Sequence, residues 1–448
     1  MVHLYEMTHE YELIILQKTP TGHLFLRGGS ERAYPASRPR TSKERSTEND
    51  DTKRGRALKT ALWLYLFMFV AFFDLHAQYP ILTPFALSLG AAPTFIGWMM
   101  GVYSLTHLPG NVIAGYWVDR RGSKPFIVAS LIGAGLLLVL QSRVTDPWQL
   151  LCIRSVSGFV LAFLSPACLS MLAKLGKNRT QQGKLMAGNG LVHTLASVVS
   201  PAAGAALVAK VGFTASFTVL GWALIAIGCA AAFGIREVGA DRPARASAVS
   251  IGHPPQNRRD PSIRPGDFTD MPWHFFGVPL ALACSQGILF FELPLLRQSQ
   301  ASILTSGLLF SMVSLGALLT LSFMFLNRYS PLARTVFGAL ALALVFFGLA
   351  VRWPVPLAVS LFLIGMAKGV IFPAMATLLA AVTKVSRYGR AFSLLSVSSS
   401  VGAFVGPVLA GYFRYHISSY FIAFLILMSA VTLLISHKFR FHDVPAID

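Results

Sequence analysis

Long apolar stretches constrain this sequence more than any other feature. From about residue 60 onward, uninterrupted apolar runs of about 20 residues recur along the chain, and a run of that length crosses the ~30 Å hydrocarbon core of a bilayer as a helix. The runs are continuous rather than alternating, which excludes a transmembrane β-barrel. The sequence predicts an all-α integral membrane protein with twelve spans, near residues 60–86, 94–117, 125–142, 148–173, 184–207, 212–234, 273–296, 303–326, 334–350, 355–380, 391–412 and 418–436.

Composition excludes the other broad classes. Of 448 residues, 54% are hydrophobic and 13% are charged, whereas a soluble chain averages about 45–50% apolar and about 25% charged residues. A disordered chain would need low hydrophobicity. Four cysteines, none in a metal-ligand spacing, predict no disulfide framework and no metal site, and we expect no cofactor beyond a proton gradient.

The net charge of +19 reflects membrane topology rather than nucleic-acid binding, because the basic residues lie between the apolar runs. With a cytoplasmic N-terminus, the predicted outer loops hold five Lys and Arg, and the inner loops with the C-terminal tail hold twenty. This bias predicts a multi-pass protein of the plasma (inner) membrane with both termini cytoplasmic.

A long polar segment divides the chain into two halves of six spans. The predicted organisation is a cytoplasmic, mostly disordered tail over 1–58, a six-helix bundle over 59–235, a cytoplasmic linker over 236–271, a second six-helix bundle over 272–437 and a cytoplasmic tail over 438–448. Residues 1–57 could also reflect a start site placed too early.

The two halves repeat each other in sequence. The segment FFDL in the first span recurs as FFEL in the seventh, and prolines recur at matching places in the fourth and tenth and in the fifth and eleventh spans. The matching residues are Phe72–Leu75 with Phe290–Leu293, Pro166 with Pro373, and Pro201 with Pro407. Repeated halves are typical of secondary transporters.

The loop after the second span reads GYWVDRRGSK, from Gly115 to Lys124. It resembles the signature loop of the major facilitator superfamily, G-x-x-x-D-R-x-G-R-K, with Ser123 in place of an arginine. The resemblance extends over about residues 60–436 and implies two pseudo-symmetric six-helix bundles that rock about a central cavity. It also implies a gating role for this loop, carried by Gly115, Asp119, Arg120, Gly122 and Lys124. The alternative is a plain basic cytoplasmic loop.

Two further motifs are similar to those of the family's drug and metabolite:proton antiporters. The fourth span carries Leu150-x-x-x-Arg154-x-x-Ser157-Gly158, which resembles a motif implicated in proton or substrate coupling. The fifth and eleventh spans carry glycines and prolines that resemble the helix-bending antiporter motif, at Pro201, Gly204, Gly402, Gly406, Pro407 and Gly411. Small residues with proline also serve ordinary helix packing.

Four charged residues lie inside predicted spans. They are Asp74, Arg154, Glu292 and Lys368, in the first, fourth, seventh and tenth spans. The resemblance implies that these spans line the cavity, so we expect the two acids and two bases to pair across it, because an unpaired charge in hydrocarbon is costly. Asp74 is the best proton carrier and Lys368 the best partner for a negative group of a substrate.

Each of these charges also has an ordinary structural interpretation. Asp74 could be only a structural partner of Arg154, and Arg154 could extend to the outer interface. Glu292 could be a solvated interfacial acid near the outer end of its span. Uncharged polar side chains in the spans are further cavity candidates, although each is more often an interhelical hydrogen bond; they are His76, Gln78, His107, Asn111, His193 and Gln286.

Together these features predict a secondary active transporter that works by alternating access. The resemblance to the major facilitator superfamily also implies that it acts as a monomer. The favoured function is proton-coupled export of a small amphiphilic or partly anionic organic compound. A proton-coupled importer remains the alternative within the same class. A membrane-embedded enzyme would need a cluster of His and Asp or paired acids at the membrane edge, which the loops lack, and Asp74 argues against a non-transporting sensor.

Overall fold

The computed structural model describes residues 42–176, 179–235, 273–296, 302–323, 328–383 and 388–436. Throughout these ranges the regular structure is helical, and they contain no strand. Residues from Arg54 onward form one compact unit. The predicted linker over 236–271 and the tail over 438–448 lie outside the described residues, as does residue 1 to residue 41 of the predicted N-terminal tail.

The first half of the chain folds into seven helical elements. They are α1 (Ser42–Ala77), α2 (Tyr79–Ser88), α3 (Pro93–Arg121), α4 (Lys124–Gln141), α5 (Pro147–Leu161), α6 (Leu164–Leu175) and α7 (Arg179–Gly234). α1 begins earlier than predicted, at Ser42, within the segment expected to be disordered. This segment is rich in Glu, Lys and Arg, which are good helix formers.

The second half consists of six α-helices and two short 3₁₀ helices. The α-helices are α8 (Gly277–Glu292), α10 (Ile303–Leu321), α11 (Pro331–Ala350), α12 (Leu357–Val382), α13 (Tyr388–Phe413) and α14 (Ser419–Ser436). The 3₁₀ helices η2 (Trp273–Phe276) and η3 (Leu293–Leu295) extend α8 at its two ends.

Prolines and one glycine explain why element ends differ from span ends. Pro80 has no N–H to donate to the carbonyl of residue 76, and the first span breaks into α1 and α2 at Gln78. Pro166 interrupts the fourth span between α5 and α6 in the same way. Conversely, the single element α7 contains two predicted spans. Gly212 lies between them, and its positive φ of 82° turns the chain from one span to the next.

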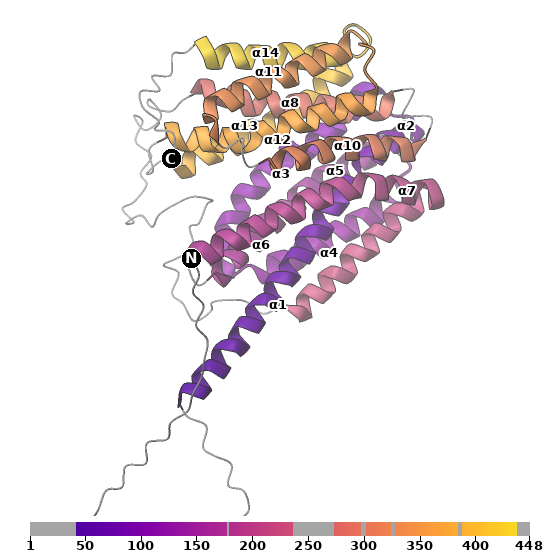
Figure 1. Ribbon diagram of the computed structural model, residues 1–448. Coiled ribbons are helices and arrows are strands. Elements are labelled where there is room, and N and C mark those ends of the chain that lie inside the picture. The colour runs from indigo at the N-terminus through magenta and orange to yellow at the C-terminus, as the bar shows by residue number, and fades with distance from the viewer. Residues whose placement is uncertain are drawn as a thin grey trace, which may run out of the picture. The chain divides into compact units, whose positions relative to one another are not determined.

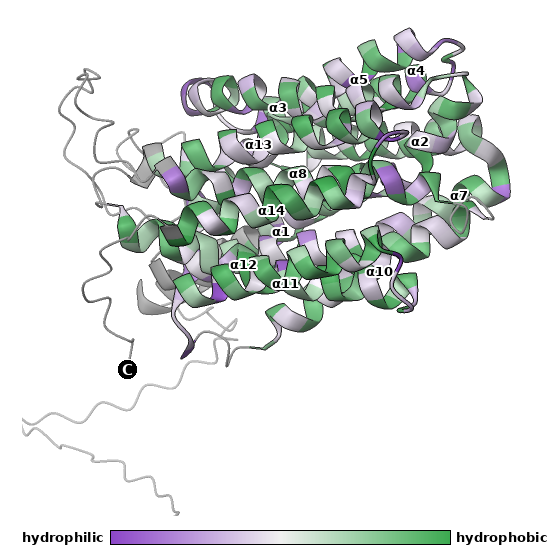
Figure 2. Cartoon of the chain, turned by 90° about the horizontal axis from the view of Figure 1, so that it is seen from above, coloured by the Kyte–Doolittle hydropathy of each residue, from purple (hydrophilic) through white to green (hydrophobic). Residues whose placement is uncertain are grey.

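Membrane-spanning character is evident along most of the chain. In the part that the structure describes, nine helices are long and apolar enough to cross a membrane. Hydrophobic residues run along the length of nearly every helix (Figure 2). The predicted count of twelve counts the two arms of α7 as separate spans and adds two helices. These are the more polar α3 and α14, whose apolar part is the shorter helix Ser419–Ile435. The chain is a multi-pass membrane protein.

The two halves contact each other at the end predicted to be extracellular. Figure 1 shows α2, α7 and α10 meeting there. Glycines permit the close approach: a Cβ added at Gly97 of α3 would collide with the carbonyl of Pro407 on α13. A Cβ added at Gly411 would lie 2.8 Å from the carbonyl oxygen of Pro93. Both pairs lie close to the ends of α3 and α13 on this side of the protein.

The opposite end of α3 makes no such contact. Gly115, the first residue of the predicted gating loop, is small enough to permit close helix contact, yet no heavy atom of a neighbouring segment lies within 4 Å of a Cβ built there. The halves meet at the other end of α3, and the gating role of Gly115 stays a prediction. The two halves are therefore in close contact at the predicted outer end, whereas Gly115 at the predicted inner end is exposed and has no neighbouring segment beside it.

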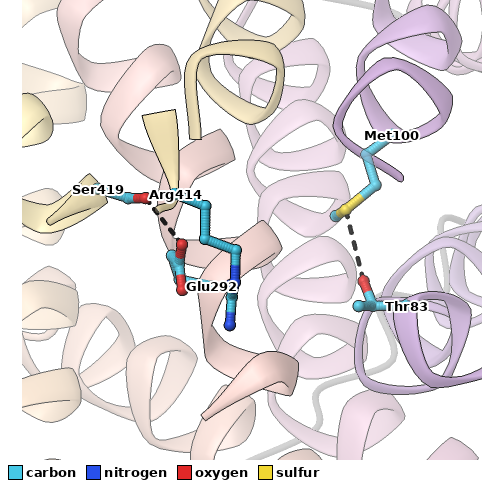
Figure 3. Close-up of polar contacts among 5 residues, drawn as sticks. All are labelled: Thr83, Met100, Glu292, Arg414 and Ser419. Atoms are coloured by element: carbon cyan, nitrogen blue, oxygen red, sulfur yellow. Dashed lines mark hydrogen bonds and ion pairs between the residues drawn. The ribbon is translucent and has the colours of Figure 1, made fainter. Parts of the chain in front are cut away.

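One ion pair fixes the turn between α13 and α14. Arg414 Nη1 donates to Glu292 Oε2 at 2.8 Å, and Ser419 Oγ donates to Glu292 Oε1 at 2.7 Å (Figure 3). Glu292 is 8% exposed, and both of its oxygens are satisfied. Figure 3 also shows Thr83 of α2, which donates to the sulfur of Met100 on α3 at 3.6 Å.

The glycine contact predicts how the protein closes. Gly97→Ala places a methyl group against the Pro407 carbonyl, and overpacking of this kind costs about 1–3 kcal/mol. We expect the outer-closed population to fall about five- to hundredfold relative to the open one. Distances between spin labels on residue 89 and residue 415 would measure the shift. Gly190→Ala is the control, because nothing lies within 4 Å of a Cβ built there; equal distances in the two variants would contradict the prediction.

We expect the loss of this ion pair to lower the stability of the protein without lowering transport. Glu292→Gln removes a charge-assisted hydrogen bond, which is worth about 1.5–3 kcal/mol, so we expect a lower thermal unfolding temperature in detergent. Because Glu292 and Arg414 act on each other, Glu292→Gln combined with Arg414→Gln should cost less than the sum of the single changes. Strictly additive losses would show that the pair contributes nothing.

Candidate functional site

A cavity of about 390 Å³ lies between the two halves of the chain. Helices of both halves contribute its walls, and in the first half these are α1, α2, α3 and α5. Its lining residues are Leu75, Tyr79, Leu82, Met100, Tyr103, Ser104, His107, Asn111, Arg154, Pro279, Leu282, Ala283, Gln286, Gly287, Phe290, Phe372, Met375, Ser396, Ser399, Ser400, Ala403 and Pro407. A volume in this range suits a small organic molecule.

Aromatic side chains close the cavity toward the predicted outer side. The rings of Tyr79 and Phe290 lie 4.3 Å apart between centroids, and Phe290 lies 5.3 Å from Phe310. These residues come from α2, α8 and α10, so both halves contribute to the cluster. It forms an apolar surface against which a flat ligand could pack.

Other lining residues are small and polar. Ser396, Ser399 and Ser400 follow one face of α13 at helical spacing, and all three line the cavity. Asn111 and His107 of α3 also line it, and the Nδ2 atom of Asn111 lies 2.9 Å from Nδ1 of His107, one turn earlier. The cavity therefore offers an aromatic surface, hydroxyl groups and an amide within one space.

Arg154 carries the positive charge of the cavity lining. Its guanidinium lies over the ring of Tyr103, 4.6 Å from the centroid, which is a cation–π geometry. Its Nη1 donates to Oε1 of Gln78 at 2.9 Å. Only 5% of Arg154 is exposed, so the side chain faces protein and the cavity rather than the outer interface.

Gln78 links Arg154 to Asp74. The Nε2 of Gln78 donates to both carboxylate oxygens of Asp74, at 2.9 and 3.0 Å. Asp74 is 2% exposed. The amide therefore uses its donor side on the acid and its acceptor side on the base, so that acid and base are joined through one side chain instead of a direct ion pair. The broken helix between α1 and α2 places Gln78 at this position.

Lys368 lies in a different part of the interface between the halves. Its Nζ is 5.9 Å from the ring of Phe372, which lines the cavity, whereas Lys368 does not. The imidazoles of His76 and His193 lie 5.3 Å apart, within electrostatic range of Lys368. His76 Nδ1 is also 2.7 Å from the carbonyl oxygen of Phe72.

The expectation that four charges meet across one space is wrong. Glu292 pairs with Arg414 at the end of α8 and does not line the cavity. The structure joins Asp74 and Arg154 through Gln78 and places Lys368 beside two histidines. Of the uncharged candidates, His107, Asn111 and Gln286 line the cavity, while Gln78 forms the bridge and His76 and His193 contact each other.

The predicted gating loop is a tight turn between α3 and α4. Gly122 ends α3 with φ 87° and ψ 169°, a conformation that favours glycine. Arg120 lies over Tyr116, 4.6 Å from the ring centroid. Asp119 and Arg120 occupy the last turn of α3, and Lys124 begins α4. All of them lie at the end of α3 that is predicted to be cytoplasmic.

The predicted helix-bending residues are contact points between helices. A Cβ at Gly204 would lie 2.7 Å from the Cβ of Ala77, and one at Gly307 would lie 2.5 Å from the carbonyl oxygen of Pro201. Gly402 and Gly406 of α13 pack against the backbone of α8. The structure thus supports the alternative interpretation of these motifs, in which small residues allow helices to approach closely.

Sequence reasoning missed Tyr103 and the serine face of α13. Tyr103 gives no signal by itself, because a single tyrosine on an apolar helix is common. The serines do give one: Ser396, Ser399 and Ser400 repeat at three- and four-residue spacing, which places hydroxyl groups on one face of an otherwise apolar helix. Within the described ranges, no group of three or more His, Cys, Asp and Glu could hold a metal ion.

Comparison with known proteins agrees with this architecture. The family model described as Major Facilitator Superfamily matches residues 64–355 and 335–446. The "Uncharacterized MFS-type transporter YuxJ" of Bacillus subtilis (strain 168) is 24% identical over 406 residues, covering 83% of this chain and 98% of the relative. The "Multidrug resistance protein MdtG" of Escherichia coli (strain 55989 / EAEC) is 23% identical over 378 residues, covering 81% of this chain and 89% of the relative.

Solved structures show the same fold. A bacterial homologue of the human lysosomal transporter Spinster, in an inward-facing and occupied conformation, superposes with a TM-score of 0.63 at 15% identity and covers 84% of this chain and 94% of that one. A likeness at this identity shows the fold alone, whereas the matched family model is one of membrane transporters and not of enzymes. With its family model matched over both halves, the chain belongs to the major facilitator superfamily.

Proposed function

We propose that the protein is a proton-coupled secondary transporter that exports a small amphiphilic organic compound by alternating access. One observation carries the proposal: a buried carboxylate, Asp74, is joined through Gln78 to Arg154, whose side chain lines the cavity between the halves. Such a connection lets a proton bound outside the cavity change the charge presented inside it. The similarity to a multidrug resistance protein supports export.

The amide of Gln78 can act as a two-position switch. With Asp74 ionised, the Gln78 N–H groups face the acid and its oxygen holds Arg154. A proton on Asp74 creates an O–H donor, which is satisfied when the Gln78 amide turns its oxygen toward it. The amide N–H groups then face the guanidinium, and since two donors cannot bond each other, Arg154 is released toward the cavity.

Release of Arg154 has opposite effects on substrates of opposite charge. A freed guanidinium occupies space in the cavity and adds an uncompensated positive charge, which disfavours a cationic or neutral amphiphile. Proton and substrate then compete, which is antiport. An anion instead gains a partner when Asp74 is protonated, which is symport. The buried Arg154 is therefore the specific observation that favours the alternative, proton-coupled import of a small anionic metabolite.

The remaining candidates fit this cycle in supporting roles. Lys368, behind Phe372, contributes positive potential to the interface between the halves. The Asp119 loop closes the predicted inner side when the outer contacts at Gly97 separate. The proposal places both termini in the cytoplasm and the protein in the plasma membrane as a monomer, in keeping with the excess of Lys and Arg in the predicted inner loops.

Transport in vesicles tests the proposal. The purified chain would be reconstituted with a pH-sensitive dye trapped inside, and a panel of amphiphilic compounds would be added, with tetraphenylphosphonium as the cationic probe and benzoate as the anionic one. Antiport predicts proton movement opposite to tetraphenylphosphonium, and symport predicts proton movement with benzoate. Substrate movement without any proton flux across the panel would overturn the proposal.

Replacing the acid should abolish coupling. Asp74→Asn keeps the side-chain shape and can still accept from the Gln78 amide, but it cannot bind or release a proton. We expect proton-driven transport to fall to the level of empty vesicles, while the thermal unfolding temperature stays close to that of the wild type. Full proton-driven transport by this variant would remove Asp74 from the mechanism.

Replacing the amide should separate binding from protonation. Gln78→Leu is one bond shorter and offers neither a donor nor an acceptor, so the hydrogen-bonded link from Asp74 to Arg154 is lost. We expect tetraphenylphosphonium affinity in the wild type to fall about tenfold on protonation of Asp74, the factor that about 1.4 kcal/mol of repulsion from the released guanidinium produces. The affinity of Gln78→Leu should not change with pH.

Ser396→Ala is the matched control for this experiment, since it removes a polar group from the cavity wall without touching the bridge. It should keep the wild-type pH dependence even where its affinity is lower. A Gln78→Leu variant that titrates like the wild type would show that Asp74 reaches the cavity by another route.

A further inference from the structure

A second cavity, of about 580 Å³, lies within the second half of the chain, away from the substrate site. Three consecutive helices, α10, α11 and α12, contribute to it. Its lining residues are Thr320, Phe323, Tyr329, Ala333, Arg334, Phe337, Gly338, Ala341, Val345, Leu363, Met366, Ala367 and Val370. The described lining of the substrate cavity shares no residue with this set.

Helix packing explains why this space exists. α12 packs against both α10 and α11, and the residues that it contributes form the floor of a groove between them. α11 contributes a stripe that runs from Arg334 through Phe337, Gly338 and Ala341 to Val345, at the three- and four-residue spacing of a single helix face. A Cβ at Gly338 would collide with Ile371 on α12, 2.6 Å away, so α11 and α12 lie in close contact along the groove.

The groove opens on the surface that faces the bilayer. Tyr329 and Phe337 are 61% and 69% exposed, and both line it. All three helices are long and apolar enough to cross a membrane. The contents of the groove must therefore be compatible with hydrocarbon along most of its length.

One end of the groove carries a charge. Arg334 lies in the first turn of α11, is 9% exposed and lines the groove. Thirteen residues line the space, and Arg334 is the one among them with a formal charge. A guanidinium at the end of an apolar groove matches a molecule with a negative head and an apolar tail.

The length of the groove matches one leaflet. From Arg334 to Val345 the helix advances about 16 Å at 1.5 Å per residue, and half of the ~30 Å hydrocarbon core is about 15 Å. The charged end lies at the helix start, where a lipid headgroup would be found, and the apolar walls extend toward the middle of the bilayer.

We propose that this groove binds one anionic phospholipid, with an acyl chain between α10 and α11 and its phosphate near Arg334. The predicted topology places the start of α11 at the cytoplasmic side, so the lipid comes from the inner leaflet. The site is independent of the transport cycle proposed above, because it lies within one half of the chain.

Native mass spectrometry of the full chain tests the site. The protein would be purified from, or reconstituted in, membranes with equal amounts of phosphatidylglycerol and phosphatidylcholine, and the retained lipid would be counted per chain. We expect one phosphatidylglycerol per chain in the wild type. Ala341→Trp fills the groove and should remove it.

Leu344→Trp is the matched control, because Leu344 lies on the same helix, is 54% exposed and does not line the groove. It should retain the lipid. Equal retention by Ala341→Trp and Leu344→Trp would overturn the proposal, as would a second copy of the chain in place of lipid in the wild-type spectrum.

The charge at Arg334 is tested separately. Arg334→Gln should reduce the preference for phosphatidylglycerol over phosphatidylcholine about fivefold, the factor expected for one basic residue at an anionic lipid surface, and Arg334→Lys should restore most of it. Arg352→Gln, which removes an exposed arginine beyond the other end of α11, should leave the preference unchanged. If Arg334→Gln and Arg334→Lys gave the wild-type ratio, Arg334 would not contact the headgroup.

Discussion

The cost of a charge inside a membrane determines how this structure is arranged around Asp74. A carboxylate at 2% exposure has lost its water and needs other partners. The Nε2 of Gln78 donates to both carboxylate oxygens of Asp74, and the Oε1 of Gln78 accepts from the positively charged Arg154. Because the amide separates the acid from the base, the pair is held together without the tight ion pair that would keep Asp74 permanently ionised.

The two halves of the chain satisfy their buried acids with different partners, although their sequences repeat. Asp74 and Glu292 occupy matching positions in FFDL and FFEL, but the residue four positions later is Gln78 in one half and Leu296 in the other. One turn after Asp74 there is an amide, whereas one turn after Glu292 there is none. Glu292 is satisfied instead by Arg414 and Ser419 from a distant part of the chain. One acid therefore connects to the cavity and the other fastens two helices.

Sequence predicted the fold well and the site in part. Each predicted span corresponds to helix in the described residues, since apolar length is a local property. Arg154, His107, Asn111 and Gln286 were also predicted for the cavity and line it. The pairing of Glu292 could not be predicted, because Arg414 is 122 residues away and lies outside the predicted spans. Likewise, nothing local indicates that the ring of Tyr103 covers the guanidinium of Arg154.

Glycine and proline positions connect these local arrangements to movement of the halves. At the closed end, the backbones of α3 and α13 are in contact at Gly97 and Gly411. Such contacts require that neither residue carries a Cβ atom. At the other end, Gly115 has open space beside it, although the family pattern places a small residue there. In the alternating-access cycle proposed above, a glycine at each end of α3 would let the same helix pack closely on either side of the membrane in turn. In the same proposal, protonation of Asp74 would act beside the break at Gln78, where the first span is least able to stay straight.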